Sequence, residues 1–152
     1  MVAPNARELA FEVLSEMVDD GGDLGYMDEA LPALTAFISE VATPDFVCKL
    51  VGAPPVAELT YPGVDGLAEA WREWGEAFEK VRAKLEQVLE SEDHIVLLVS
   101  QVATTRHQGV EITQPSAMVF AFEDDRVARL EFHLDRDHAL RTAGLDPQSS
   151  QA

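Results

Sequence analysis

Disulfide bonds, a membrane span and a secretion signal all lack support in this sequence of 152 residues. Its single cysteine, Cys48, excludes an internal disulfide framework. No apolar run approaches the roughly 20 residues that a membrane-spanning helix needs. The N-terminal residues contain no basic segment followed by an apolar one, as a signal peptide would. These absences predict a soluble protein of the cytoplasm.

Basic residues are also scarce. The chain has 11 lysines and arginines against 28 aspartates and glutamates, which gives a formal net charge of −17. Such a charge repels phosphate backbones and anionic lipids, so we expect neither nucleic acid nor a membrane surface as a partner. Four of the arginines each lie close to an acidic residue in the sequence and predict no basic patch: Arg126, Arg129, Arg136 and Arg141.

Motifs for cofactors and metals are missing as well. The chain contains no glycine-rich nucleotide motif, no CxxC pair and no GxSxG serine motif, so we expect no cofactor. Four residues near the C-terminus have side chains that can bind metals: His133, Asp135, Asp137 and His138. A junction between a strand and a helix would point them in different directions, and Asp135 is expected to cap the helix. We therefore expect no metal site.

What the chain does contain is enough apolar residues for one core. Apolar side chains make up 47% of the sequence, and the length suits a single domain. We expect this domain to cover residues 1–145 and residues 146–152 to form a frayed tail. Cys48 stands in an apolar run and is expected to be a small buried filler.

Apolar spacing predicts helices and strands in separate groups. Helical spacing recurs in four segments: 5–19, 28–41, 65–80 and a short one at 135–144. Strands are expected in five segments: 46–51, 81–90, 94–106, 110–122 and 126–135. The segment 81–90 is expected at the edge of the sheet, and 52–63 is expected to be a loop. This segregation of helices and strands predicts an α+β fold.

The last three strands are joined by short breaks and therefore predict an antiparallel meander. Asp124 and Asp125 must make the last turn, since Asp tolerates left-handed backbone better than most residues. Two of these strands are apolar at successive positions, in Ile95–Val99 and Ala117–Phe122, which predicts that both faces of the sheet are covered. With helices on one face, a second subunit is the simplest cover for the other. We therefore predict a homodimer that forms through the sheet.

Three segments resemble the SnoaL-like proteins of the nuclear transport factor 2-like superfamily. The segment 61–78 (YPGVDGLAEAWREWGEAF) is similar to an aromatic-rich helix of that family, and 107–112 (HQGVEI) to one of its turns. The segment 120–145 is similar to the closing strand and helix. The resemblance implies a cone-shaped fold, in which a curved antiparallel sheet carries helices on its concave face. It also implies a pocket for a small molecule.

Enzymes of this superfamily place an acid or a base inside an apolar pocket, where its pKa can be tuned. Alternation along the last strand turns one set of side chains toward the pocket: Ala128, Leu130, Phe132 and Leu134. The other set points away: Val127, Arg129, Glu131, His133 and Asp135. Phe132 stands near the position where some relatives have Asp, and it cannot transfer a proton. Glu131 and His133 are the candidates for a catalytic pair, but we favour an ion-pair ladder on a surface or interface.

Six residues are expected to contact a ligand: Tyr61, Trp74, Gln101, Met118, Phe120 and Phe132. Tyr61 precedes the helix at the pocket and Trp74 lies on it, although both also suit ordinary core packing. Gln101 is polar in an otherwise apolar strand, so it either bonds to backbone or contacts a ligand. The other three follow from the alternation of their strands.

Two functions remain open. A pocket lined by apolar residues favours a SnoaL-like protein of uncharacterised activity that binds a small apolar or semi-polar molecule. The alternative is a cofactor-independent acid/base enzyme of the isomerase, polyketide cyclase, dehydratase or epoxide hydrolase type. An ionisable side chain inside the cavity would distinguish the two.

Overall fold

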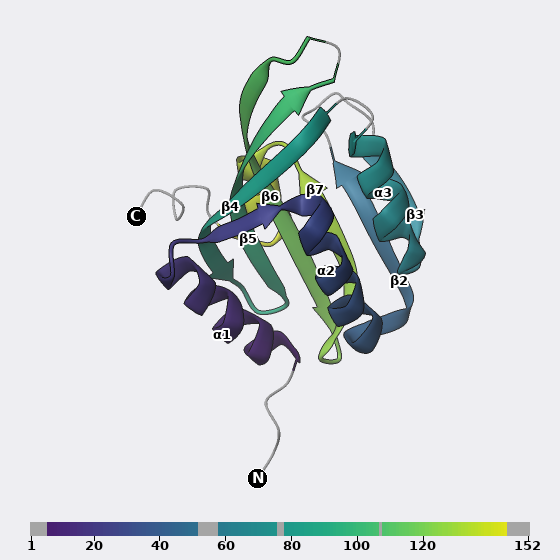
Figure 1. Cartoon of the computed structure of the whole chain (residues 1–152). Coiled ribbons are helices and arrows are strands. Elements are labelled where there is room, and N and C mark those ends of the chain that lie inside the picture. Colours follow the sequence, from purple (N-terminus) through teal and green to yellow (C-terminus); the bar gives the residue numbers. More distant parts are fainter. Residues whose placement is uncertain (1–5, 52–57, 76–77, 107, 146–152) are drawn as a thin grey trace.

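The computed structural model describes residues 6–51, 58–75, 78–106 and 108–145 (Figure 1). The described residues form four helices: α1 (Ala6–Asp19), α2 (Met27–Val41), α3 (Asp65–Gly75) and α4 (Arg136–Thr142). They form seven strands: β1 (Asp23–Tyr26), β2 (Ala42–Val51), β3 (Glu58–Pro62), β4 (Phe78–Glu90), β5 (His94–Thr105), β6 (Glu111–Glu123) and β7 (Arg126–His133). All these strands belong to one curved sheet with the order β1-β4-β5-β6-β7-β2-β3. The expected α+β class is confirmed.

Strands β4 to β7 form an antiparallel meander, which includes the three strands for which the sequence predicts one. The turn between β6 and β7 consists of Asp124 and Asp125, with φ angles of +50° and +69°. Both aspartates therefore adopt the left-handed backbone that a two-residue hairpin turn favours. The sheet also contains a parallel pair, because β2 runs alongside β7 in the same direction.

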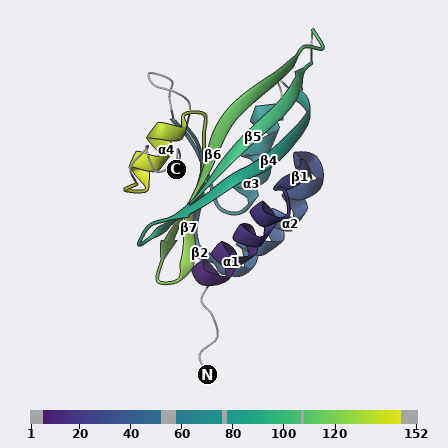
Figure 2. The same cartoon turned by 90° about the vertical axis from the view of Figure 1, so that its left-hand side faces the viewer.

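Three helices cover the concave face of the sheet, and the main core lies beneath them (Figure 2). Helix α1 packs against β4, α2 against β1 and β4, and α3 against β2 and β3. The side chains of Ile38, Leu67 and Ile95, which come from α2, α3 and β5, are almost completely buried in this core. Burial of each such side chain contributes about 1.5–3 kcal/mol, so this layer is a main source of stability.

The outer face of the sheet is covered in part by α4 (Figure 2). The helix packs on outward side chains of β5 and β6 in a second buried cluster: Val96, Leu98, Ala117, Val119, Ala139, Leu140 and Ala143. The apolar runs in β5 and β6 are thus buried by the chain's own helix. A second subunit, the cover that the sequence made simplest, is therefore not needed to bury these runs, and the homodimer itself stays a prediction.

The cap of α4 follows the sequence prediction. The carboxylate of Asp135 accepts a hydrogen bond from the backbone N–H of His138 at 3.2 Å. This bond satisfies an N–H group that has no partner inside the helix. Asp135 is therefore a structural residue at the point where the chain leaves β7 and crosses the outer face.

The edges of the sheet differ from prediction. The segment 52–63 is expected to be a loop, but its last part forms β3 and pairs with β2, while residues 52–57 lie outside the described residues. Edge strands tolerate proline, which explains why Pro62 does not prevent this pairing. At the other edge, the glycine-rich segment between α1 and α2 forms β1, for which the sequence predicts no strand. Strand β4 therefore lies between β1 and β5, and its predicted edge position is wrong.

Gly22 allows β1 to approach β4 closely. Its carbonyl accepts a hydrogen bond from the N–H of Leu85 at 2.7 Å, and its φ angle is +75°. A Cβ atom at this position would lie 2.0 Å from the carbonyl oxygen of Leu85. Only glycine combines this backbone angle with the space that the contact leaves.

Helix α3 ends at Gly75, earlier than the predicted residue 80, and β4 follows. The alternation that predicts this strand is confirmed. Val81, Ala83 and Leu85 are buried, whereas Arg82 and Lys84 between them are exposed. The period of two therefore decides the structure of a segment whose composition also suits a helix.

A bulge in β7 shifts the predicted alternation. Ala121 lies opposite Arg129, but the next residue, Phe122, lies opposite Val127, which leaves Ala128 as the extra residue. Val127, predicted to point away, therefore packs in the concave core together with Leu130. Beyond the bulge the predicted alternation holds.

Candidate functional site

An apolar cavity of about 530 Å³ lies between α1, α2 and the concave face of the sheet. Both helices and the sheet contribute large apolar side chains: Leu14 and Met17 of α1, Leu34 and Phe37 of α2, and Leu97, Met118 and Phe120 of β5 and β6. Residues three or four apart share one face of a helix, which explains how α1 and α2 each present an apolar wall. The two helices and the curved sheet enclose this space without filling it.

Helix α1 leaves the cavity open to solvent on one side. Leu9 and Val13 line the cavity, and yet they remain 46% and 47% exposed. Apolar side chains exposed at a concave surface are typical of a site that binds another molecule. The cavity therefore has an apolar rim that is accessible from outside.

Asp23 is the one ionisable residue among the described residues that line the cavity. One oxygen of its carboxylate accepts a hydrogen bond from the N–H of Gly25 at 2.8 Å. The other oxygen pairs with the guanidinium of Arg82 at 3.3 Å, and the two side chains are 68% and 54% exposed. Asp23 therefore lies at the solvent-exposed edge of the cavity, with a cation beside it.

Residues 33–130, from within α2 to the middle of β7, match the model of the SnoaL-like domain family. The chain belongs to the SnoaL-like domain family. The resemblance to the nuclear transport factor 2-like superfamily is thereby confirmed. No curated protein matches this SnoaL-like protein.

Solved structures with the same fold share little sequence with this SnoaL-like protein. A nuclear transport factor 2-like protein of unknown function from Burkholderia pseudomallei K96243 is 22% identical, and the match covers 77% of this chain and 87% of that one with a TM-score of 0.54. A hypothetical protein with a ketosteroid isomerase-like fold from Catenulispora acidiphila DSM 44928, in complex with trimethylamine, is 12% identical, with coverages of 75% and 85% and a TM-score of 0.51. TerC, co-crystallised with polyporic acid, is 18% identical, with coverages of 72% and 84% and a TM-score of 0.51. At these identities the likeness shows the fold alone.

The residues predicted to contact a ligand fall into four groups. Met118 and Phe120 line the cavity of the SnoaL-like protein. Phe132 and Tyr61 are partly buried against the concave core but are not among the residues that line the cavity. Gln101 lies opposite Ala83, a residue of the concave core, so it faces the concave side of the sheet, as predicted. It is not among the residues that line the cavity. The side chain of Trp74 lies outside the described residues. Ligand contact by all six residues stays a prediction.

Most of the cavity wall comes from segments that the sequence reasoning does not assign to the site. The apolar stripes of α1 and α2 indicate buried helix faces, but they do not reveal that a space remains between these faces and the sheet. Asp23 carries no signal of its own, because it belongs to a strand that is hidden in a glycine-rich segment. The exposed Leu9 and Val13 are recognisable only once α1 is placed on the sheet.

Glu131 and His133 lie on the outer face, on the opposite side of the sheet from the cavity. Their side chains meet at 2.6 Å between Glu131 Oε1 and His133 Nε2, and Arg129 pairs with the other oxygen of Glu131. The His133 ring also contacts the ring of His138 on α4, with 5.3 Å between the ring centroids. Glu131 and His133 are 5% and 2% exposed, so α4 and the neighbouring strands shield them from solvent.

Burial and charge act against each other on Glu131. Burial raises the pKa of its carboxyl, but the hydrogen bond from His133 and the positive charge of Arg129 outweigh that effect. The net result is a pKa below the usual value for glutamate. Glu131 therefore holds its negative charge inside a local ion-pair network. This agrees with the ion-pair interpretation that we favour for these residues.

Cys48 is a free, buried cysteine. Burial raises the pKa of the Cys48 thiol to about 12, so the thiol stays protonated at neutral pH, as suits a buried filler. Within the described ranges, no group of three or more His, Cys, Asp and Glu side chains is arranged to hold a metal ion. No helix in this part of the chain is long and apolar enough to cross a membrane.

Proposed function

We propose that this SnoaL-like protein binds a small apolar or semi-polar molecule in the cavity between α1, α2 and the sheet. The observation that carries this proposal is the apolar wall of a cavity of about 530 Å³. Sites for small molecules are typically clefts of about 300–1,000 Å³ with mostly apolar linings. Removal of apolar ligand surface from water contributes about 25 cal/mol per Å², so a cavity of this kind favours such a ligand without a specific polar contact.

Two proteins with the same fold support the proposal in general terms. One is in complex with trimethylamine, and TerC is co-crystallised with polyporic acid. These ligands belong to those proteins. What they support for this chain is a cavity that serves as a binding site.

A fluorescence titration tests the proposal. N-phenyl-1-naphthylamine is a neutral apolar dye that becomes brighter in apolar surroundings, and we expect it to bind the full chain with one site. The variant Ala30→Phe fills part of the cavity and should weaken binding about tenfold, which corresponds to about 50 Å² of lost apolar contact.

Ala36→Phe provides the matched control, because Ala36 lies on the same helix but is exposed and does not line the cavity. This variant should keep the affinity of the unmodified chain. Equal affinity in both variants would place the dye elsewhere and contradict the proposal.

The alternative function is a cofactor-independent acid/base enzyme. Asp23 is the observation that favours it, because this carboxylate lines the cavity. Asp23 is mostly exposed and paired with Arg82, whereas an acid/base carboxylate of this superfamily is expected in an apolar pocket. Glu131 and His133 lie on the other face of the sheet. Binding is therefore the function that the geometry supports best.

Three predictions concern the oligomeric state, the partners and the location of the protein. A homodimer through the sheet now depends on the part of the outer face that α4 leaves uncovered. Light scattering at micromolar concentration tests it, and a mass of one chain would contradict it. The net charge of −17 predicts that neither nucleic acid nor a membrane surface is a partner. The cytoplasmic location also stays a prediction.

A further inference from the structure

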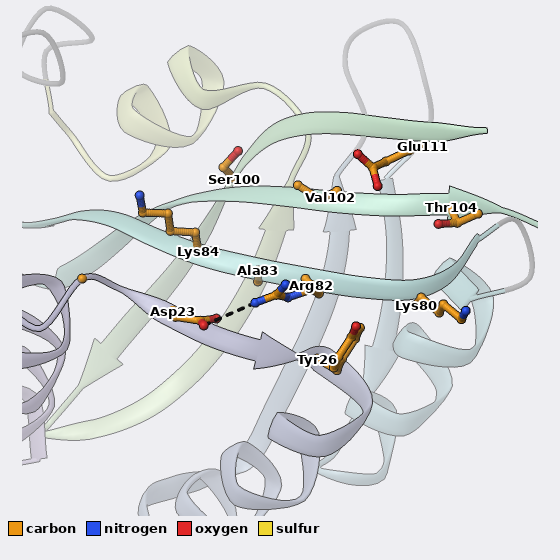
Figure 3. A pocket seen from close by; sticks show the side chains of 11 residues that line it. Asp23, Tyr26, Lys80, Arg82, Ala83, Lys84, Ser100, Val102, Thr104 and Glu111 are labelled. Atoms are coloured by element: carbon orange, nitrogen blue, oxygen red, sulfur yellow. Dashed lines mark hydrogen bonds and ion pairs between the residues drawn. The ribbon is translucent and has the colours of Figure 1, made fainter. Parts of the chain in front are cut away.

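A second hollow, of about 670 Å³, lies on the outer face of the sheet (Figure 3) and shares only Asp23 with the described lining of the apolar cavity. It is lined mostly by outward residues of β4 and β5 and by the first and last residues of β1, Asp23 and Tyr26. Ser100 and Val102 of β5 have the same alternation as Val96 and Leu98, which α4 covers. The hollow therefore occupies one area of the outer face that α4 does not cover, bounded by β1, β4 and β5.

Three basic residues follow one another along β4 in this hollow, and we call them the basic row: Lys80, Arg82 and Lys84. Arg82 and Lys84 are two residues apart and share one face of the strand, because side chains alternate. Lys80 lies on the other side of a shift in the strand pairing and also lines the hollow. The whole chain has 11 lysines and arginines against 28 acids. A local row of cations is therefore unexpected in this composition.

Arg82 is held in place by two neighbours. Its guanidinium pairs with Asp23 at 3.3 Å and lies 5.5 Å from the centre of the Tyr26 ring. Figure 3 shows the Arg82 side chain turned toward Asp23, with Tyr26 beside it. A salt bridge and an aromatic ring together restrict an otherwise flexible side chain.

Lys80 adopts an unfavourable backbone conformation. Its φ angle is +52°, and the pairing of β4 with β5 shifts between Glu79 and Arg82. Left-handed backbone is unfavourable for a non-glycine residue, and bulges often redirect a side chain at a functional site. A lysine at a position that glycine would occupy without strain suggests that its ammonium group is needed there.

Lys80 and Lys84 have no carboxylate partner among the described residues. Near them, Ser100 and Thr104 add hydroxyl groups that can donate hydrogen bonds to an anion. Glu111 also lines the hollow and opposes an anion at that end. Asp23 is already paired with Arg82, so the local balance of unpaired charge is positive.

We propose that this hollow is a second binding site, which takes a small molecule with at least two carboxylate or phosphate groups. Lys84 and Lys80 each contact one anionic group, and Arg82 contributes between them. The net charge of −17 repels a large polyanion, so the ligand is a small molecule. Salt screens charges that lie more than about 8 Å away, so contacts with the nearby cations decide whether a small anion binds. Nucleic acid is therefore not the occupant.

Isothermal titration calorimetry of the full chain tests the site with two probes at equal ionic strength. Inorganic pyrophosphate represents phosphate groups, and citrate represents carboxylates. We expect at least one of them to bind with one site per chain and to bind more weakly as sodium chloride is added. The stronger of the two identifies the anionic group, and absence of binding by both would overturn the proposal.

Lys84→Gln removes one cation from the hollow, and it should weaken binding of the better probe about fivefold. Arg72→Gln is the control, since it removes one charge from an exposed position on α3 outside the hollow. It should keep the affinity within about twofold. An equal loss in both variants would show a general charge effect and overturn the proposal.

Lys80→Gly separates binding from folding. Glycine relieves the left-handed strain, so the midpoint of thermal unfolding should rise by about 2–4 °C while the affinity for the probe falls. A more stable protein that binds more weakly cannot have lost the site by unfolding. Unchanged affinity in Lys80→Gly would show that Lys80 is not part of the site. Unchanged affinity in both Lys80→Gly and Lys84→Gln would overturn the proposal.

The two sites can be tested independently. Lys84→Gln should leave binding of N-phenyl-1-naphthylamine unchanged, and Ala30→Phe should leave binding of pyrophosphate or citrate unchanged. Failure of dye binding would affect only the cavity. Failure of anion binding would affect only the basic row.

Discussion

The concave face of the sheet and its outer face differ in what covers them and in where they hold charge. The concave face is apolar, lies under three helices and retains an open space. The outer face is closed by one short helix at one end, where it buries the Glu131–His133 pair, and carries the basic row at the other. Because side chains alternate along each strand, the apolar lining of the cavity and the ionic groups lie on opposite faces of the same sheet.

This difference places the ionisable candidates of the sequence on the face opposite to the cavity. Glu131 and His133 pair with each other on the outer face, where the His133 ring contacts His138 of α4. Among the described residues that line the cavity, only Asp23 has a side chain that can transfer a proton. The comparison predicts that substitutions on the two faces have different consequences for stability and for binding.

The largest effect is expected from the same substitution placed on each face. Leu140→Asp puts a charge under α4, where Leu140 is fully buried, and should destabilise the protein by about 3–5 kcal/mol in urea denaturation. Leu9→Asp lies at the rim of the cavity, and it should change the free energy of unfolding by less than about 1 kcal/mol while weakening dye binding. Equal destabilisation by both would contradict the difference between the faces.

An intermediate effect is expected from Glu131→Gln. The folded protein lowers the pKa of Glu131, so its contribution to stability is present above the unfolded pKa of about 4.5 and is lost as the pH falls through the lower folded value. The variant should be less stable by about 1–3 kcal/mol at neutral pH and should lose less stability in acid.

Urea midpoints of both proteins between about pH 7 and about pH 3 measure this difference. Glu123→Gln is the control, because Glu123 is exposed on β6. Dye binding should be the same in all three proteins. A loss of dye binding in Glu131→Gln alone would show that the outer pair acts on the cavity.

The smallest effect is expected from Asp23→Asn. The ion pair with Arg82 is largely exposed, so its loss should change the free energy of unfolding by about 0.5 kcal/mol. If apolar contacts carry binding, dye affinity should stay within about twofold. A tenfold loss would favour a direct role of this carboxylate and strengthen the acid/base alternative.

The sequence predicts the long elements well, because periodicity over ten or more residues is a strong signal. Strands β5, β6 and β7 and the Asp124–Asp125 turn lie where they are expected. Short strands such as β1 and β3 have no such signal, and pairing with a neighbour decides their structure. The bulge at Ala128 is likewise invisible, since it arises from the register with β6.

The candidate site is less predictable because it depends on how layers stack. Ala139, Leu140 and Ala143 are correctly expected to be buried, but the sequence does not say on which face. The apolar run at Ile95–Val99 therefore suggests a second subunit, although α4 covers it. The basic row is hidden for a similar reason, since its arrangement follows from the placement of β4 between β1 and β5.

Gly22 gives the molecule an unusual mutational sensitivity. The strand that it attaches carries Asp23 and ends at Tyr26, and Asp23 lines both the apolar cavity and the outer hollow. One added methyl group at Gly22 would displace a wall that the two hollows share. A position with no functional group of its own thus controls the shape of both, and a variant library should show it as intolerant as any buried core residue.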